Sequence, residues 1–334
     1  MKQQVGGRDT AARCGNCHNQ QSLTSYTPWH NIKLPIWVLS YLLRESLELH
    51  PQVLSGQHIK RKLGCAENTA YRLKRRLQLL ASDCMPIMKQ IFKENLEKEF
   101  NGFELPRDKN VDITEKVKGK PIVYADTLAL FSASQRANGG RSRFKHHGQT
   151  SSIYLTDVVA EKKGKYQIGT LVHTMANKKG MVFFDSISDQ KQLTLRPTFL
   201  NDLPREAVVM TDEGYPWLKR YMRNHRAVNH SARSKDKRNR YARNRWSKNG
   251  VHNQVAEGLG RILKHSFISG YSYVTPRFSQ LYLNEWAFMK NLRVIGLEGL
   301  IEGKKKVRGD SCVVSEGEIT TNRRSGSNDF IKAT

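Results

Sequence analysis

The stretch Asn249-Gly-Val-His-Asn-Gln-Val-Ala-Glu-Gly-Leu-Gly-Arg-Ile-Leu-Lys264 combines a helical pattern with an isolated carboxylate. Glu257 precedes Lys264 by seven residues, and because two helical turns take about 7.2 residues, both side chains lie on one helix face. The segment just before it is strongly basic, with Arg233, Lys235, Lys237, Arg238, Arg240, Arg243, Arg245 and Lys248. An acid in so basic a neighbourhood indicates a specific role for that carboxylate.

Two further acids each end a run of β-branched and apolar residues. Asp126 ends Pro121-Ile-Val-Tyr-Ala-Asp126, and Asp212 ends Glu206-Ala-Val-Val-Met-Thr-Asp212. Mg²⁺ takes hard oxygen ligands and keeps positions open for water and phosphate, and two such ions can clamp the attacking and leaving oxygens of an in-line displacement. We therefore hypothesise that Asp126, Asp212 and Glu257 converge to bind a Mg²⁺ pair for phosphodiester chemistry.

The order of the elements predicts how these acids meet. The pattern gives strands at 121–126, 166–173, 180–184 and 206–212, a weak strand at 152–155 and a short one at 227–228. Helices are expected over 189–202, over 215–224, at the Glu257 stretch and over 281–291. This is the order of a ribonuclease-H-like fold, an α/β mixed sheet with flanking helices. In that fold an acid on the first strand, one ending the fourth and one on a later helix share one edge.

Each of these residues has a simpler interpretation when it is taken alone. A strand-terminal Asp often caps a turn or a helix, Glu257 could belong to an exposed ion pair, and Lys264 could be a solvated cation. Asp157, Asp185 and Asp236 are competing acids. Asp185 follows a clear strand pattern, but that strand is predicted to be the third of the sheet and to lie at its edge, away from the site.

The N-terminal half predicts a different kind of domain. Apolar residues recur at helical steps over 34–49, Ser55 is a candidate N-cap, Gly64 marks a turn, and a second helix starts at Glu67 or Asn68. This spacing is typical of a helix-turn-helix, although a plain basic helical hairpin gives a similar pattern. On the second helix Ala70, Leu73 and Leu77 are expected to face inward.

The residues expected to bind DNA lie in two groups. Polar residues at the start of the second helix could contact base edges and the later cations phosphates, and the basic segment would hold flanking DNA. They are Asn68, Thr69, Arg72, Arg75, Arg76, Arg238, Arg240, Arg243, Arg245 and Lys248.

Composition supports a polyanion partner. The chain carries 56 Lys and Arg against 30 Asp and Glu, a net charge of +26, with a pI near 10.0. Such a surplus, clustered in places, favours nucleic acid, although charge alone does not separate it from an anionic membrane surface or from a merely basic protein. The longest apolar run, over 34–43, is too short to span a bilayer, and the first residues lack a signal-peptide core. We expect a cytoplasmic protein without a membrane partner, associated with the nucleoid when it is bound to DNA.

Cys14-Gly-Asn-Cys17 is one CxxC pair, and a zinc ribbon needs two such pairs because zinc takes four N or S ligands. Three interpretations of Cys14 and Cys17 stay open: an incomplete zinc site, a site whose first pair lies upstream of this sequence, and a solvated turn with two free thiols. The predicted organisation is a partial zinc-ribbon-like segment at 1–30, a helix-turn-helix domain at 31–100, a linker at 101–119, a catalytic domain at 120–295 and a disordered tail at 296–334.

Four motifs together resemble a known family. They are Tyr124-Ala-Asp126-Thr127, Val209-Met-Thr-Asp212-Glu-Gly214-Tyr215, His252-Asn253 through Glu257-Gly258 to Lys264, and Tyr282-Leu-Asn-Glu-Trp-Ala-Phe-Met-Lys-Asn291. Over about Cys14 to Asn291 the chain resembles DDE-type transposases of bacterial insertion sequences. The resembling branch has an N-terminal zinc ribbon, a helix-turn-helix and an ISXO-like catalytic domain.

The resemblance implies that Asp126, Asp212 and Glu257 bind two Mg²⁺ ions, with Lys264 on a DNA phosphate near the cleaved bond. It implies cleavage at the ends of the element, strand transfer into target DNA, and a homo-oligomer on double-stranded DNA. Two alternatives remain open: a non-enzymatic DNA-binding regulator, and a nuclease of the same fold without strand transfer.

Overall fold

The computed structural model describes residues 3–5, 8–13, 20–22, 24–25, 27–108, 110–131, 169–178, 180–228, 247–271 and 273–310. Met1–Val294 form one compact unit and Ile295–Thr334 a second. Several predicted features lie outside the described residues: the Cys14 and Cys17 pair, the strand at 152–155, and Arg238, Arg240, Arg243 and Arg245. At the N-terminus, β1 (Gln3–Val5), β2 (Arg8–Arg13) and β3 (Gln20–Ser22) form a small antiparallel sheet in that order.

Three helices follow: α1 (Trp37–Leu49), α2 (Gly56–Leu63) and α3 (Glu67–Phe100). The Ser55 hydroxyl accepts a hydrogen bond from the His58 N–H at 3.2 Å and caps α2 as expected. Gly64 ends α2 with a left-handed φ of 59°, a conformation that costs glycine little, so the chain turns at once into α3.

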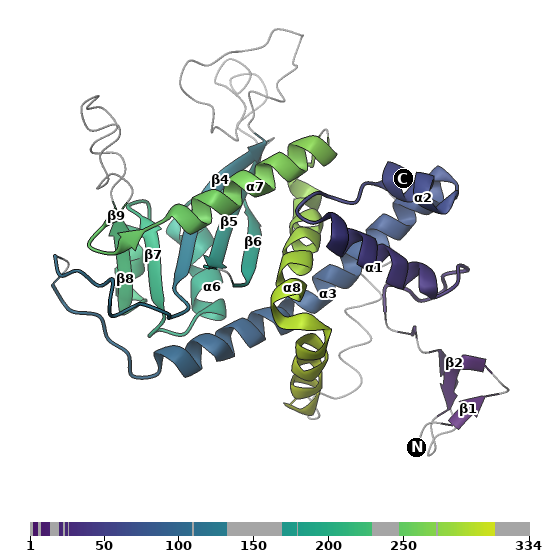
Figure 1. Ribbon diagram of the computed structural model, residues 1–334, viewed down its shortest axis with the longest axis horizontal. Helices are drawn as coiled ribbons and strands as arrows, with labels where there is room; N and C mark the ends of the chain where they lie inside the picture. The colour runs from purple at the N-terminus through teal and green to yellow at the C-terminus, as the bar shows by residue number, and fades with distance from the viewer. Residues whose placement is uncertain are drawn as a thin grey trace, which may run out of the picture. The chain divides into compact units, whose positions relative to one another are not determined.

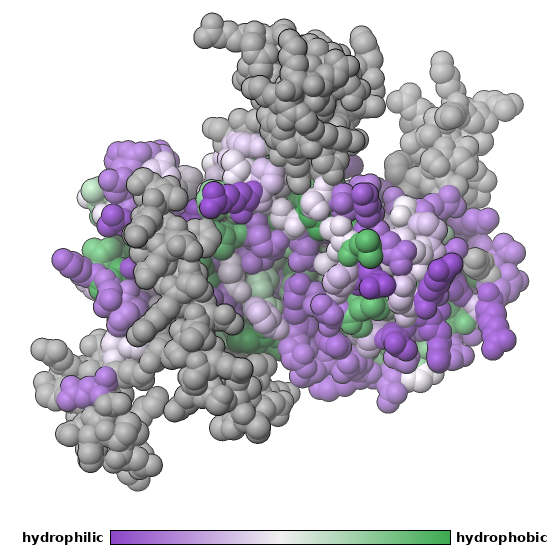
Figure 2. Space-filling model, turned by 180° about the vertical axis from the view of Figure 1, so that it is seen from behind, coloured by the Kyte–Doolittle hydropathy of each residue, from purple (hydrophilic) through white to green (hydrophobic). Residues whose placement is uncertain are grey.

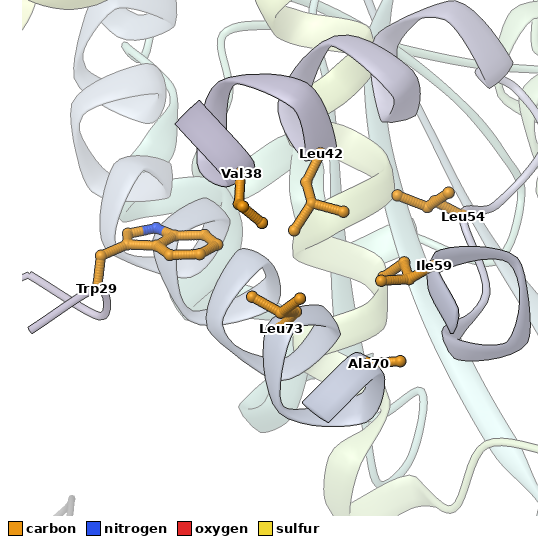
Figure 3. Packing of buried hydrophobic residues seen from close by; sticks show 7 residues of the cluster. All are labelled: Trp29, Val38, Leu42, Leu54, Ile59, Ala70 and Leu73. Carbon is orange, nitrogen blue, oxygen red and sulfur yellow. The ribbon is translucent and has the colours of Figure 1, made fainter. Parts of the chain in front are cut away.

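The interior of these helices is apolar. Figure 3 shows side chains from α1, α2, α3 and the segments before them converging on one cluster: Trp29, Val38, Leu42, Leu54, Ile59, Ala70 and Leu73. Ala70, Leu73 and Leu77 are at most 1% exposed, which confirms the predicted inward face of α3. Burial of such side chains contributes roughly 1.5–3 kcal/mol each for the larger ones, so the cluster fixes the angle between α2 and α3.

The second half of the unit is built on a five-stranded mixed sheet. Its strands are β4 (Val123–Phe131), β5 (Thr170–Asn177), β6 (Val182–Ile187), β7 (Val208–Asp212) and β8 (Asn224–Val228), in the order β6-β5-β4-β7-β8. The first three pair antiparallel, whereas β4-β7 and β7-β8 pair parallel. This mixed α/β arrangement is consistent with a ribonuclease-H-like transposase domain.

Helices cover both faces of the sheet (Figure 1). On one face α7 (Gln254–Gly270) crosses β4 and β5, and its Gly260 abuts Leu128. On the other face Phe199 of α6 (Gln192–Asp202) packs on the ring of His173, and Phe92 of α3 packs on Phe183. The helix α3 therefore reaches from the N-terminal helices to the sheet without a break.

The edge strand β6 is covered by α8 (Pro276–Asp310). The Asn291 amide accepts a hydrogen bond from the Val182 N–H at 2.8 Å and donates one to the Val182 carbonyl at 2.9 Å. Likewise, the Gln280 amide accepts a hydrogen bond from the Ser186 N–H and donates one to the Phe184 carbonyl, each at 2.8 Å. These side chains satisfy backbone groups that an open edge would offer to another strand.

The same helix ties the N-terminal helices to the sheet. Lys74 of α3 and Glu285 of α8 form an ion pair, and each residue is only 5% exposed. Nearby, the Asn284 amide donates to the Ser82 hydroxyl at 3.0 Å. Removing one partner of a buried ion pair lowers the free energy of unfolding by several kcal/mol. These contacts therefore hold α3 and α8 in a fixed register.

The structure differs from the predicted elements in three places. The strand predicted to end at Asp126 continues as β4 to Phe131, because residues 127–131 also pair with β5, so this acid lies within the strand. Instead of a helix over 215–224, a short 3-10 helix, η2 (Pro216–Arg220), precedes β8. Residues from Asn224 onward pair with β7 as a strand, and the Asn224 amide donates to the carbonyls of Phe103 and Glu206. Beyond Gly296, where the backbone breaks at φ 71° and ψ 171°, residues 297–310 are helical rather than disordered.

On the face shown in Figure 2 the described surface is mostly hydrophilic, with small separate hydrophobic areas. None of the described helices has an apolar stretch long enough to cross a membrane. Scattered exposed apolar side chains such as Leu193 and Trp37 are normal on a folded protein.

Candidate active site

The sheet places Asp126 and Asp212 side by side. Ala125 of β4 is paired with Thr211 of β7 in parallel register, so the next residue on each strand is one of the two acids. Neighbouring strands lie about 4.8 Å apart. Two acids that are 86 positions apart in sequence therefore lie next to each other on two inner strands of the sheet, where β7 ends and β4 continues.

The helix α7 brings Glu257 and Lys264 toward these acids. A Cβ atom on Gly260 would lie 2.7 Å from Leu128 Cδ2, so α7 packs closely on the Leu128 side chain of β4 at this position. Leu128 is two residues from Asp126 and shares its face of the sheet. Glu257 lies one turn before Gly260, in the first turn of α7, where its N–H donates to the Asn253 carbonyl at 3.2 Å.

The pKa of Asp126 reflects the three other residues. Burial, then the charge of Asp212 and the charge of Glu257, together raise the pKa of Asp126 to about 7, while the Thr127 N–H and Lys264 act to lower it. A carboxylate close to like charges resists ionisation. The site therefore holds more negative charge than its own residues neutralise, which is the condition that a bound cation relieves.

The donor set fits a hard divalent cation. One oxygen of Asp126 accepts the Thr127 N–H at 2.7 Å, and one oxygen of Asp212 accepts the Gly214 N–H at 3.0 Å. The hydrogen bonds orient both carboxylates, and three carboxylates supply oxygen ligands of the kind that Mg²⁺ prefers. As the side chains stand, no group of three His, Cys, Asp or Glu in the described part of the chain is arranged to hold a metal.

Aromatic residues surround the acids. Tyr215, three residues after Asp212, is 3% exposed, and burial raises the pKa of its hydroxyl well above 10, with Asp126 and Asp212 adding to the effect. Its hydroxyl lies near Thr127 without a hydrogen bond of standard geometry to any described residue. The ring of His252 stacks on Tyr124, with centroids 4.9 Å apart. The residues before α7 therefore lie close to the strand that carries Asp126.

The competing acid Asp185 has a different environment. Lys89 of α3 lies 3.4 Å from Asp185 and 2.7 Å from Asp202. Burial lowers the pKa of Lys89, but the two carboxylates outweigh burial and raise it. Asp185 therefore belongs to an internal ion-pair cluster, and sequence pattern alone had not indicated Lys89 as its partner. Asp157 and Asp236 lie outside the described residues.

On α3, the residues expected to bind DNA fall into two groups. Asn68 and Arg72 are exposed and Thr69 is half-buried. Arg76 instead donates to the carbonyls of Pro28 and His30, and Arg75 stacks on two rings of α8. The first turns of the helix are therefore accessible from solvent, whereas the later cations Arg75 and Arg76 make contacts within the protein. Lys248, on β9 (Ser247–Lys248), which pairs with β10 (Val251–His252), is exposed.

Comparison with known proteins gives one match. Residues 139–291 match the family model of the ISXO2-like transposase domain. This range includes Asp212, Glu257 and Lys264 and begins after Asp126. No curated protein and no solved structure matches the chain. The family match and the mixed α/β sheet together support a DDE transposase, and thus an enzyme that acts on DNA.

Proposed function

We propose that the chain is the transposase of a bacterial insertion sequence of the ISXO-like branch, which cleaves DNA at the ends of the element and joins them to target DNA. The observation that supports this proposal is the parallel register of β4 and β7, which puts Asp126 next to Asp212. Burial and the charges of Asp212 and Glu257 raise the pKa of Asp126 to about 7. A group of like charges on a sheet has no stabilising role of its own.

The roles of the residues follow from their positions. Asp126, Asp212 and Glu257 would hold Mg²⁺, which when bound activates water or a 3′-hydroxyl and stabilises the leaving oxygen. Lys264, two turns along α7 from Glu257, would bind a phosphate beside the cleaved bond. Hydrolysis of the phosphodiester frees a 3′-hydroxyl, and the attack of that hydroxyl on a second phosphodiester joins the strands and releases a new 3′-hydroxyl. No covalent link to the protein is required.

DNA binding would involve two surfaces. Asn68, Thr69 and Arg72 at the start of α3 would contact the element's end, and the basic segment that ends at Lys248 would hold flanking DNA. Counterion release by such contacts makes binding fall steeply with salt. A homo-oligomer on paired ends would allow both ends to be cut in one complex.

The test uses the DNA that flanks the gene, where the element's inverted repeats would lie. The full-length protein is incubated with labelled flanking DNA and a target plasmid, with Mg²⁺ or with EDTA, and the products are separated on a gel. The proposal predicts Mg²⁺-dependent 3′-hydroxyl ends and joined products. Cleavage without joining would favour a nuclease of the same fold, whereas retarded DNA without either product would favour a non-enzymatic regulator.

A further inference from the structure

The strand β5 carries a buried hydroxyl directly beside Asp126. Thr174 is opposite Asp126 in the antiparallel register of β4 and β5. Directly opposed residues have Cβ atoms about 4.5–5.5 Å apart, so their side chains are neighbours on one face of the sheet. That face is the one covered by α7, because Leu128, two residues from Asp126, packs against Gly260.

The Thr174 hydroxyl needs a partner that its other neighbours do not supply. Thr174 is 0% exposed, and its hydroxyl makes no hydrogen bond to any described residue. Across β6 it is opposed by Phe184, and its same-face neighbours along β5 are Val172 and Ala176. Among these adjoining side chains of the sheet, Asp126 is the hydrogen-bond acceptor.

A buried hydroxyl without a partner loses its bonds to water and gains nothing in return. Rotation about χ1 redirects a Thr hydroxyl between staggered positions without moving the backbone. One oxygen of Asp126 already accepts the Thr127 N–H at 2.7 Å. A second donor, on the side of β5, would fix the plane of the carboxylate.

We propose that the Thr174 hydroxyl donates a hydrogen bond to Asp126 and holds this carboxylate in the orientation that binds a divalent cation. Thr174 is thus a positioning residue that acts through Asp126 without touching substrate. The inference rests on the proposed function, since it concerns the same metal site. Residues that orient a metal ligand typically contribute about 10–100-fold to metal affinity.

The test measures Mg²⁺ binding without DNA, from the rise in melting temperature as Mg²⁺ is titrated. Thr174→Val removes the hydroxyl and keeps the shape, whereas Thr174→Ser keeps the hydroxyl. Thr170→Val is the matched control, because Thr170 is also 0% exposed on β5 but donates to the Val274 carbonyl at 2.9 Å. We expect Thr174→Val to bind Mg²⁺ about tenfold more weakly, and Thr174→Ser and Thr170→Val to bind like wild type.

Wild-type Mg²⁺ affinity in Thr174→Val would overturn the inference, and so would equal weakening in Thr174→Ser, since shape rather than the hydroxyl would then matter. Asp126→Asn separates this failure from that of the proposed function. If Asp126→Asn loses Mg²⁺ binding and Thr174→Val does not, only the role of Thr174 is wrong. If wild type binds no Mg²⁺, or Asp126→Asn binds it equally well, the proposed metal site fails and the role of Thr174 fails with it.

Discussion

Asp185 and Asp202 share the ammonium of Lys89, at 3.4 and 2.7 Å, whereas Asp126 lies with Asp212 and Glu257 and is only partly offset by Lys264. Burial raises the pKa of Asp202, and Lys89 counteracts it. At Asp126 burial and the neighbouring acids act in the same direction. In the first cluster one ammonium contacts both carboxylates directly, and the cluster serves stability. We propose that an external cation offsets the second cluster, and this difference would separate a structural acid from a candidate metal ligand.

The largest expected effect concerns catalysis. Asp212→Asn should lower the Mg²⁺-dependent cleavage rate by about a thousandfold, because a metal-stabilised transition state is worth several kcal/mol and each 1.36 kcal/mol is tenfold in rate. Asp185→Asn should cleave within a few-fold of wild type. Single-turnover cleavage of flanking DNA measures both, and full activity in Asp212→Asn would remove that residue from the site.

The next effect concerns stability. Lys89→Met leaves Asp185 and Asp202 without their cation, and we expect it to lower the free energy of unfolding by about 3 kcal/mol. Lys98→Met is the matched control on the same helix, because Lys98 is exposed, and it should change stability by less than about 0.5 kcal/mol. Urea denaturation followed by circular dichroism measures both variants. Equal stability of the two variants would contradict the structural role of the Lys89 cluster.

The third effect is a pH dependence in metal-free buffer. The pKa of Asp126 is about 7 in the folded protein against 3.8 for an unperturbed Asp, so between these values the folded state binds more protons than the unfolded state. The contribution of Asp126 to stability therefore decreases as pH rises from about 4 to about 7. Urea denaturation in EDTA across this range should show the decrease in wild type and not in Asp126→Asn. An identical pH profile in both proteins would show that burial and the neighbouring acids do not raise the pKa of Asp126.

Much of the fold followed from local pattern. The strand ending in Asp212, the Ser55 cap and the Gly64 turn are local signals, and the structure contains all three. The segment 215–224 was predicted as a helix, because its pairing with β7 and the contacts of Asn224 are tertiary and leave no local signal. The helix over 297–310 was missed since Gly296 and the charged residues after it indicated a tail.

The candidate site was predictable only in part, because some of its residues carry local signals and others are placed by register and packing. Asp212 carries a local signal, an acid at the end of an apolar strand. The same pattern led to the prediction that Asp126 ends its strand, although β4 continues to Phe131. The order of elements indicates that the two acids lie on neighbouring strands. The contacts of Arg75 and Arg76 within the protein, the pairing of Lys89 with Asp185, and the position of Thr174 opposite Asp126 depend on register and packing. A one-residue change of register turns a strand's side chains to the other face, so sequence pattern alone does not fix such neighbours.

The most direct test of the central claim is Mn²⁺ binding measured by calorimetry on wild type, Asp126→Asn and Asp185→Asn, without DNA. Both variants remove one carboxylate charge from the same sheet, one from each acidic cluster. We predict that wild type and Asp185→Asn bind Mn²⁺ with similar affinity and that Asp126→Asn does not bind it. Equal binding by Asp126→Asn and wild type would contradict the assignment of Asp126, Asp212 and Glu257 as the metal site.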